Sequence, residues 1–410
     1  MKALTFEYSV PRYLLTGLLA KANPSVTVSG LAPVGLREVA EPEVPGEDWV
    51  KLRPILSGLC GSDMSIVLCR ESLTLQPFAS YPFVLGHEVC ARIVKVGKEV
   101  AGFREGDRVV VMPMLGCIPR KIEPPCPACA SGRYALCENF TRGSLPPGMF
   151  VGSNRATPGF ISEAGVAHVS QLYGVPDEVT DENAVLVEPF SVALHMVVWN
   201  RIREDETLLV YGCGVMGLCT VAAIKLLHPG VRVLAVEPNP LNARLAREFG
   251  AEEVIKPGGE GFYRKIAELT GAKLHKPLLA QPILSGGVDR VFDTVGNTET
   301  VNSSLRVIRG GGWYNLLGIG EVGRVDWTPV WLKELTVRGV YGYKGEPDEE
   351  ALPDFDAFAA TISFMREGKV DLSRLVTHRF KLEDWRKALM VALNKAKYGA
   401  VKIVFHVDRR

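Results

Sequence analysis

The fold of this chain is decided by residues 208–217, which read LLVYGCGVMG. The apolar residues predict a buried strand, and the glycines after it form the pattern Gly-x-Gly-x-x-Gly at the start of a helix-like segment. Gly212 permits a tight turn, Gly214 lets the backbone approach a pyrophosphate, and Gly217 lets the helix pack closely on the strand. The pyrophosphate is expected at the positive N-terminus of the helix. The stretch therefore predicts a dinucleotide-binding loop.

Glu237 completes this pattern, because it follows Gly217 by 20 residues and comes directly after the next apolar run, 231–236. Its carboxylate can accept hydrogen bonds from the ribose hydroxyls of an adenosine. A 2′-phosphate in the same place would bring like charges together, at a cost of roughly 4 kcal/mol for a unit pair about 4 Å apart. The sequence thus favours NAD over NADP. The candidate cofactor-binding residues are Gly212, Gly214, Val215, Met216, Gly217 and Glu237.

Strand-like and helix-like segments alternate around this loop. Apolar runs at 288–293 and 313–317 predict further strands, with helical spacing between them. Such alternation is typical of an α/β domain with a doubly wound parallel sheet. Residues 273–286 contain prolines and show no clear period, so we expect a loop there. From about residue 340 the alternation stops.

The first half of the chain follows a different pattern. Short apolar runs at 49–52, 91–96 and 108–111 are separated by turn signals rich in glycine and proline. This pattern predicts an all-β, barrel-like unit. Residues 10–30 and 145–159 show no period, and we expect both segments to be irregular.

Two stretches of this first half carry the residue types that zinc prefers as ligands. One is GLCGSD at 58–63, which contains Cys60, and the other is GHE at 86–88, which contains His87. Glu188 could supply a third ligand. A site with three protein ligands keeps one position open, so these residues predict a catalytic zinc that acts as a Lewis acid.

Length and composition restrict the possible classes of protein. At 410 residues the chain is expected to form two domains, and its 47% hydrophobic and 23% charged residues are typical of a globular enzyme. The net charge of +1 argues against a nucleic-acid or acidic-membrane partner. Nine cysteines, several in Cys-x-x-Cys spacing, indicate metal ligation in a reducing compartment.

The apolar run at 14–20 is far shorter than the roughly 20 residues that span a bilayer. No signal peptide is recognisable, so we expect a cytoplasmic protein.

These motifs resemble the zinc-dependent medium-chain dehydrogenases, the group of alcohol, polyol and threonine dehydrogenases. The similarity runs from residues 1–3 through both metal motifs, 106–109, the glycine loop and 310–312 to a tail at 377–402. It implies two domains, one inserted in the other. Their predicted bounds are 1–190 for a GroES-like β-barrel catalytic domain, 191–339 for a Rossmann NAD-binding domain, and 340–410 for the return to the catalytic domain.

The resemblance also implies roles for the site residues. Cys60 and His87 bind the catalytic zinc, and Asp63 stands behind His87 and orients its ring. Polyol- and threonine-type relatives have a glutamate at the place of Glu188, and the glutamate at Glu88 can also ligate, so both stay candidates for the third ligand. The candidate catalytic residues are Ser62, Cys60, His87, Glu88 and Glu188.

A second cysteine cluster has the spacing of the family's structural zinc lobe. Cys126, Cys129 and Cys137 match three of its four ligands. The fourth position falls at Glu123, whereas Cys117 lies further back beyond a longer loop. Thiolate is the softer zinc ligand, which favours Cys117 over Glu123. Four thiolates leave no room for substrate, so this second zinc is expected to support folding.

The implied reaction is the reversible oxidation of an alcohol, polyol or related hydroxyl compound to a carbonyl, with hydride transfer to NAD. Ser62 takes the hydroxyl proton, and Ser65 stands where many relatives have a relay histidine. His195 is expected to be packed or to lie near the cofactor rather than to bind metal. Rival hypotheses are a glucose-type sugar dehydrogenase or an aldehyde/ketone reductase using NADP, and a non-catalytic nucleotide-binding protein with structural zinc only. The family commonly forms homodimers or homotetramers.

Overall fold

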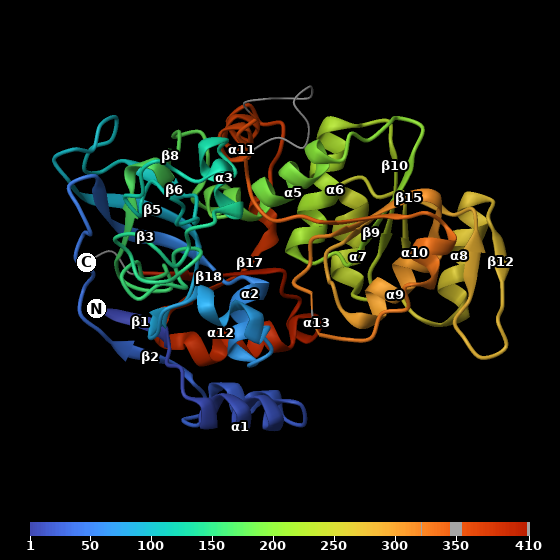
Figure 1. The fold of residues 1–410 in the computed structure, drawn as a ribbon, viewed down its shortest axis with the longest axis horizontal. Helices are drawn as coiled ribbons and strands as arrows, with labels where there is room; N and C mark the ends of the chain where they lie inside the picture. Colours follow the sequence, from blue (N-terminus) through green and yellow to red (C-terminus); the bar gives the residue numbers. More distant parts are fainter. Residues whose placement is uncertain (321, 345–354, 408–410) are drawn as a thin grey trace. The chain divides into compact units, whose positions relative to one another are not determined.

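The computed structural model describes residues 1–320, 322–344 and 355–407. The chain forms two compact units, and Figure 1 traces both along the sequence. Unit 1 comprises Met1–Ser191 and Gly342–Arg410, and unit 2 comprises Val192–Tyr341. Among the described residues, none of the helices has the length and apolar character needed to cross a bilayer.

Unit 2 is built on a six-stranded sheet with the strand order β11-β10-β9-β14-β15-β16. The strands are β9 Thr207–Tyr211, β10 Arg232–Val236, β11 Glu253–Ile255, β14 Val288–Asp293, β15 Ile308–Leu316 and β16 Thr336–Gly339. All neighbouring strands are parallel. The chain builds outward from β9 through β10 and β11, then returns to pair β14 with the other side of β9. This reversal makes the sheet doubly wound, as the alternating pattern predicts.

Helices connect these parallel strands (Figure 1). They are α6 Val215–Leu227, α7 Pro240–Glu248, α8 Gly259–Thr270, α9 Thr298–Val307 and α10 Thr328–Leu332. Asn239 and Asn297 cap α7 and α9, since each side-chain oxygen accepts a backbone N–H of the first turn. The apolar faces of α8 and α9 pack on the sheet, where Phe262 and Leu305 are buried with Val291.

The segment at 273–286 is not a loop, so that prediction is wrong. It forms an antiparallel hairpin of β12 Lys273–His275 and β13 Ile283–Ser285. Each strand has only three residues, too few for alternation to show in the sequence. The two prolines, Pro277 and Pro282, lie in the turn between the strands and do not interrupt the ladder.

Unit 1 contains two sheets, as expected of a β-rich unit. A three-stranded sheet has the order β2-β1-β4, and a seven-stranded sheet has the order β17-β18-β3-β5-β6-β8 with β7 paired to β3. The strands are β1 Lys2–Phe6, β2 Val34–Glu38, β3 Trp49–Gly58, β4 Phe83–Val84, β5 Glu88–Val96, β6 Arg108–Val111, β7 Gly165–His168, β8 Leu172–Gly174, β17 Val376–Lys381 and β18 Lys402–His406. Strand β18 comes from the C-terminal part of the chain and pairs with β3, so both segments of unit 1 share one sheet.

The helices of unit 1 have four to eleven residues. They are α1 Val10–Ala20, α2 Gly61–Val67, α3 Pro127–Ala130, α4 Asp181–Ala184, α11 Ala357–Arg366, α12 Trp385–Leu393 and α13 Lys395–Tyr398, and α5 Val187–Trp199 leads from unit 1 into unit 2.

Residues 10–30 are helical where irregular structure was expected, so that prediction is also wrong. Helix α1 is followed by a 3-10 turn, η1, at Pro24–Val28. Pro11 lies in the first turn of α1, where a proline is compatible with a helix. The usual helical signal is an apolar stripe that becomes buried. In α1 the leucines point away from the core, and this arrangement hides that signal.

Candidate metal centres and dinucleotide loop

One buried carboxylate connects the two turns that carry the thiolate and the imidazole. Cys60 is the N-cap of α2, and Asp63 accepts a hydrogen bond from its backbone N–H at 2.9 Å. The other oxygen of Asp63 accepts from the N–H of Gly86 at 3.2 Å, directly before His87. Gly86 has a φ of 95°, a left-handed conformation that favours glycine. Asp63 therefore holds the backbone of Cys60 and of the residue directly before His87, and its predicted role behind the His87 ring stays a prediction.

The structure brings three of the predicted ligands together. The ligand atoms of Cys60, His87 and Glu88 all lie within 4.8 Å of one another. His87 and Glu88 are buried, with exposed fractions of 8% and 1%. A thiolate, an imidazole and a carboxylate form a donor set that suits zinc and leaves a fourth tetrahedral position. Two residues after Cys60, the Oγ of Ser62 is buried and has no hydrogen-bond partner in the described part of the chain.

The two candidate glutamates have different surroundings. Glu88 forms a buried ion pair with Lys402 on β18, and their side chains are 2% and 1% exposed. Glu188, on α5, accepts a hydrogen bond from the hydroxyl of Tyr343. Burial raises the pKa of Glu188 to about 7. Within the described residues, Glu88 belongs to the metal-ligand cluster and Glu188 does not.

The electrostatics of this cluster favour a cation. Burial alone lowers the pKa of His87, but the charges of Cys60 and Asp63 raise it well above its usual value. Lys402 is a buried cation that pairs with Glu88, and the charges of Cys60 and Glu88 also act on Lys395. Buried charges need partners, and a divalent metal ion bound by these ligands would be a further partner for the thiolate and the carboxylate.

A second set of ligands lies in the loop after β6. Cys117, Cys126, Cys129 and Cys137 are buried, and their sulfur atoms lie within 4.8 Å of one another. None of the nine cysteines forms a disulfide. Backbone N–H groups donate to the sulfur atoms. The N–H of Cys126 lies 3.4 Å from the Cys117 sulfur, and the N–H of Asn139 lies 3.3 Å from the Cys137 sulfur. Glu123 is exposed and outside this cluster of described residues.

Arg120 holds this cysteine loop to the segment that follows it. Its side chain is fully buried and donates hydrogen bonds only to backbone carbonyls. The acceptors are the carbonyls of Leu115, Arg142, Leu145, Pro146 and Gly148. Guanidinium is well suited to this arrangement, because it presents five N–H donors in one plane.

The segment 145–159 lacks helices and strands, as expected, but it is closely bonded. The side chain of Asn154 donates to the Pro146 carbonyl at 2.6 Å and accepts from the N–H of Ala156 at 2.8 Å. Phe150 lies on this segment, and its ring is edge-on to the imidazole of His87 with 5.2 Å between centroids. The segment thus places an apolar side chain against a metal-ligand candidate.

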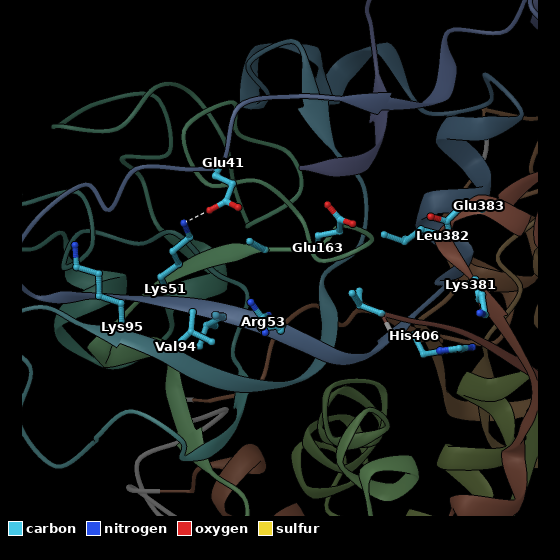
Figure 2. Close-up of a pocket in the computed structure, with 13 residues that line it drawn as sticks. Glu41, Lys51, Arg53, Val94, Lys95, Glu163, Lys381, Leu382, Glu383 and His406 are labelled. Carbon is cyan, nitrogen blue, oxygen red and sulfur yellow. Dashed lines mark hydrogen bonds and ion pairs between the residues drawn. The ribbon is translucent and has the colours of Figure 1, made fainter. Parts of the chain in front are cut away.

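Unit 1 also has a groove of about 490 Å³, shown in Figure 2. Its lining carries both signs of charge, and Lys51 forms an ion pair with Glu41 there. The lining residues are Glu41, Lys51, Leu52, Arg53, Val94, Lys95, Glu163, Ala164, Lys381, Leu382, Glu383, His406 and Val407. This groove includes none of the candidate metal ligands, so the metal cluster is the better candidate for an active site.

In unit 2 the glycine loop has the geometry of a dinucleotide site. Gly212 follows β9 with a φ of 84°, and Gly214 is the N-cap of α6. A Cβ on Gly217 would lie 1.8 Å from the Gly212 carbonyl oxygen, so only glycine fits. A Cβ on Gly214 would meet no atom within 4 Å, and the space above this residue is therefore open to a ligand. Val215 and Met216 form the first turn of α6.

Glu237 is buried at the end of β10 and is fixed to the glycine loop. One oxygen of its carboxylate accepts from the N–H of Cys213 at 2.7 Å, and the other accepts from the N–H of Asn239 at 2.8 Å. Each carboxylate oxygen has a further lone pair, so the group can still accept bonds from ribose hydroxyls. His195 is packed against Trp199, with 5.4 Å between ring centroids.

The chain is similar to known proteins. The family model for the alcohol dehydrogenase GroES-like domain matches residues 46–177, and that for the zinc-binding dehydrogenase matches residues 215–360. The L-threonine 3-dehydrogenase of Vibrio parahaemolyticus is 30% identical over 362 residues, which cover 87% of this chain and 92% of that protein. The chain belongs to the zinc-dependent medium-chain dehydrogenase family. The resemblance inferred from the motifs is thereby confirmed.

Further relatives of this medium-chain dehydrogenase support the same conclusion. The sorbitol dehydrogenase of Bacillus subtilis is 27% identical over 370 residues, 88% of this chain and 91% of that protein. The X-ray structure of 2R,3R-butanediol dehydrogenase from Bacillus subtilis has a TM-score of 0.72 and 25% identity, with 99% of each chain covered. The predicted combination of GroES-like and Rossmann-type folds is confirmed, and the protein is an oxidoreductase of the alcohol and polyol dehydrogenase class.

Two partners in the metal centre of this dehydrogenase were missed from the sequence. Lys402 pairs with Glu88 across 314 residues, and Tyr343 bonds Glu188 across 155 residues. Neither has a fixed spacing to the residue it contacts. A lysine within the apolar run Val401–Phe405 was the one signal available, because a charge inside a buried strand needs a partner.

Proposed function

We propose that this protein is a zinc- and NAD-dependent dehydrogenase of small hydroxyl compounds. The observation that carries this proposal is the three-ligand cluster beside the unpartnered Oγ of Ser62. The relatives are named for sorbitol, 2R,3R-butanediol and L-threonine. Each of these compounds carries a hydroxyl next to a carbon with a second hydroxyl or amino group. We infer a substrate of this kind, which binds through the oxygen that is oxidised.

The catalytic zinc is assigned to Cys60, His87 and Glu88, and Glu188, whose charge acts on His87, stays the alternative third ligand. The support for Glu88 is its place in the cluster, while Lys402 stabilises its charge. A second, structural zinc is assigned to the four-cysteine loop. Replacing Cys117 by serine should then remove one zinc per chain and lower the stability, whereas Glu123→Gln should change neither.

The residues of the chain prepare the substrate for oxidation. When bound, zinc supplies Lewis-acid polarisation of a hydroxyl oxygen, and the nicotinamide accepts a hydride. Ser62 would accept the hydrogen bond of the substrate hydroxyl, because its Oγ has no competing partner, and would pass its own hydroxyl proton on as it receives that of the substrate. Asp63 keeps the two ligand turns in place, and Phe150 limits the space beside His87.

NAD is assigned to the glycine loop and Glu237 of unit 2. We propose that unit 2 is the NAD-binding domain and unit 1 the catalytic domain. We also propose a homodimer or homotetramer in the cytoplasm, where nine free cysteines would stay reduced.

The test is a screen of NAD reduction over alcohols, vicinal diols, polyols, sugars and hydroxy amino acids, with zinc counted on the same sample. We expect turnover of vicinally substituted substrates and its loss on chelation of the catalytic zinc. Preference for a sugar or for NADP would favour the rival dehydrogenase or reductase. Full turnover by a zinc-free sample would refute the metal assignment.

A further inference from the structure

Helix α1 turns its apolar side chains toward solvent. At about 100° per residue, the exposed residues cover roughly half of its circumference without a polar side chain between them. The exposed fractions are 52% for Val10, 64% for Leu14, 45% for Leu15, 66% for Leu18 and 37% for Leu19. Surface helices of globular proteins normally bury such a stripe. Leu31, on the loop after η1, adds another half-exposed apolar residue to this region.

The orientation of α1 is fixed by contacts on its other side. The hydroxyl of Tyr13 donates to the Glu71 carbonyl at 3.2 Å. Thr16 is fully buried, and Gly17 packs so closely on Cys69 that a Cβ would lie 3.3 Å from the Cys69 Cβ. Because small and polar residues hold the helix to unit 1, the leucines cannot rotate inward. Their exposure is therefore built into the fold.

The segment that contains α1 carries only positive charges in its own sequence. Residues 8–36 contain Arg12 and Lys21 but no aspartate or glutamate. In the described part of the chain, neither of these two cations forms an ion pair. The Nε of Arg386, on α12, donates to the carbonyl of Val28 in η1 at 3.0 Å, which adds a third cation. In Figure 1, α1 lies below α12 and α2 at the outer edge of unit 1.

An apolar helix face with basic borders fits an anionic lipid surface. Such a helix lies in the plane of the membrane interface, with its leucines at the boundary of headgroups and acyl chains and its cations near anionic headgroups. A second copy of the chain fits less well. In a twofold contact the same patch meets itself, so Arg12, Lys21 and Arg386 would face other cations, and residues 8–36 offer no carboxylate to pair with them.

We propose that α1 docks this dehydrogenase on anionic lipid membranes as a peripheral protein. The net charge of +1 argued against an acidic membrane, but that value averages over the whole chain and hides the local excess around α1. The proposal concerns the location of the protein and does not depend on its substrate or on its metal content.

The test is co-sedimentation of the full-length protein with vesicles of phosphatidylcholine, with and without phosphatidylglycerol. The wild type should bind the anionic vesicles and bind neutral ones more weakly. The double substitution Leu14→Ser with Leu18→Ser should weaken binding about tenfold or more, because it removes the two most exposed leucines of α1. The matched control is Leu278→Ser with Leu279→Ser, two fully exposed leucines in the β12–β13 turn, and it should bind like the wild type.

A second pair of substitutions tests the charge independently of the leucines. Arg12→Gln with Lys21→Gln should reduce binding to anionic vesicles and leave binding to neutral ones unchanged. Three outcomes would overturn the proposal. They are no binding of the wild type to anionic vesicles, an equal loss in the Leu278 and Leu279 control, and a wild-type oligomer by light scattering that the α1 leucine variant converts to a smaller species. The last outcome would assign the face to contact between copies of the chain.

Discussion

The buried pair of Lys402 and Glu88 allows a quantitative test of the metal centre. We consider the substitution Lys402→Met, which keeps most of the side-chain volume and removes the charge. Both side chains are almost fully buried, at 1% and 2% exposure, so water cannot replace the lost ammonium group. Removing one partner of such a pair leaves an uncompensated charge and typically costs about 3–5 kcal/mol. We expect a loss of this size in the free energy of unfolding of the zinc-free protein.

The control for this substitution is a similar pair on the surface. Lys369 pairs with Glu367, but their side chains are 56% and 38% exposed. Lys369→Met should therefore change the free energy of unfolding by no more than about 1 kcal/mol. Urea unfolding of both variants after chelation gives the comparison, and zinc counting before chelation shows whether Glu88 still ligates.

The cause of the loss can be isolated by a double substitution. Lys402→Met with Glu88→Gln removes both charges, so it should be less destabilising than Lys402→Met alone. If the double variant is as unstable as the single one, the cost arises from packing and the reasoning from charge is refuted.

Three further predictions concern the ligands, the pH dependence and the cofactor. Glu88→Gln should lower zinc affinity at the catalytic site by about tenfold or more, and Glu188→Gln should lower it less; the reverse order by equilibrium dialysis would make Glu188 the direct ligand. Burial lowers the pKa of His195 to about 4, below its value in the unfolded chain, so its neutral form stabilises the fold above about pH 6.5 and this contribution is lost as the pH falls toward 4. As the pH falls over this range, the free energy of unfolding of the wild type should therefore decrease by up to about 3 kcal/mol more than that of His195→Gln. Parallel curves for the two proteins would contradict this prediction. Glu237→Ser should raise the preference for NADP over NAD by about 100-fold, measured as the ratio of kcat/KM values; an unchanged ratio would show that Glu237 does not select the cofactor.

The parts of this protein that were predictable from sequence are those with local causes. Gly212, Gly214 and Gly217 each meet a local requirement, namely a tight turn, a close approach of the ligand to the backbone, and close packing of helix and strand. Their spacing alone therefore predicts the loop. The parallel sheet follows from the alternation of strand-like and helix-like periods. Cys60 and His87 were recognisable because zinc restricts the ligand types, although their approach in space depends on Asp63.

The remaining features depend on contacts between distant residues or depart from the usual pattern of burial. Lys402 and Glu88 lie 314 residues apart in the sequence, and no periodicity encodes their pairing. Helix α1 was missed because pattern analysis assumes that apolar residues become buried, and its leucines do not. The β12–β13 hairpin was missed because strands of three residues are shorter than the period-2 signal needs.

The hydrogen bonds of Asp63 have a consequence for the uptake of the metal. Because this carboxylate joins the turns before Cys60 and His87 through the chain's own amides, their arrangement does not need the metal to exist. If zinc binds these ligands as proposed, a zinc-free molecule could take up the ion without first refolding the two turns. The supply of zinc, and not the rate of folding, would then limit recovery after treatment with a chelator.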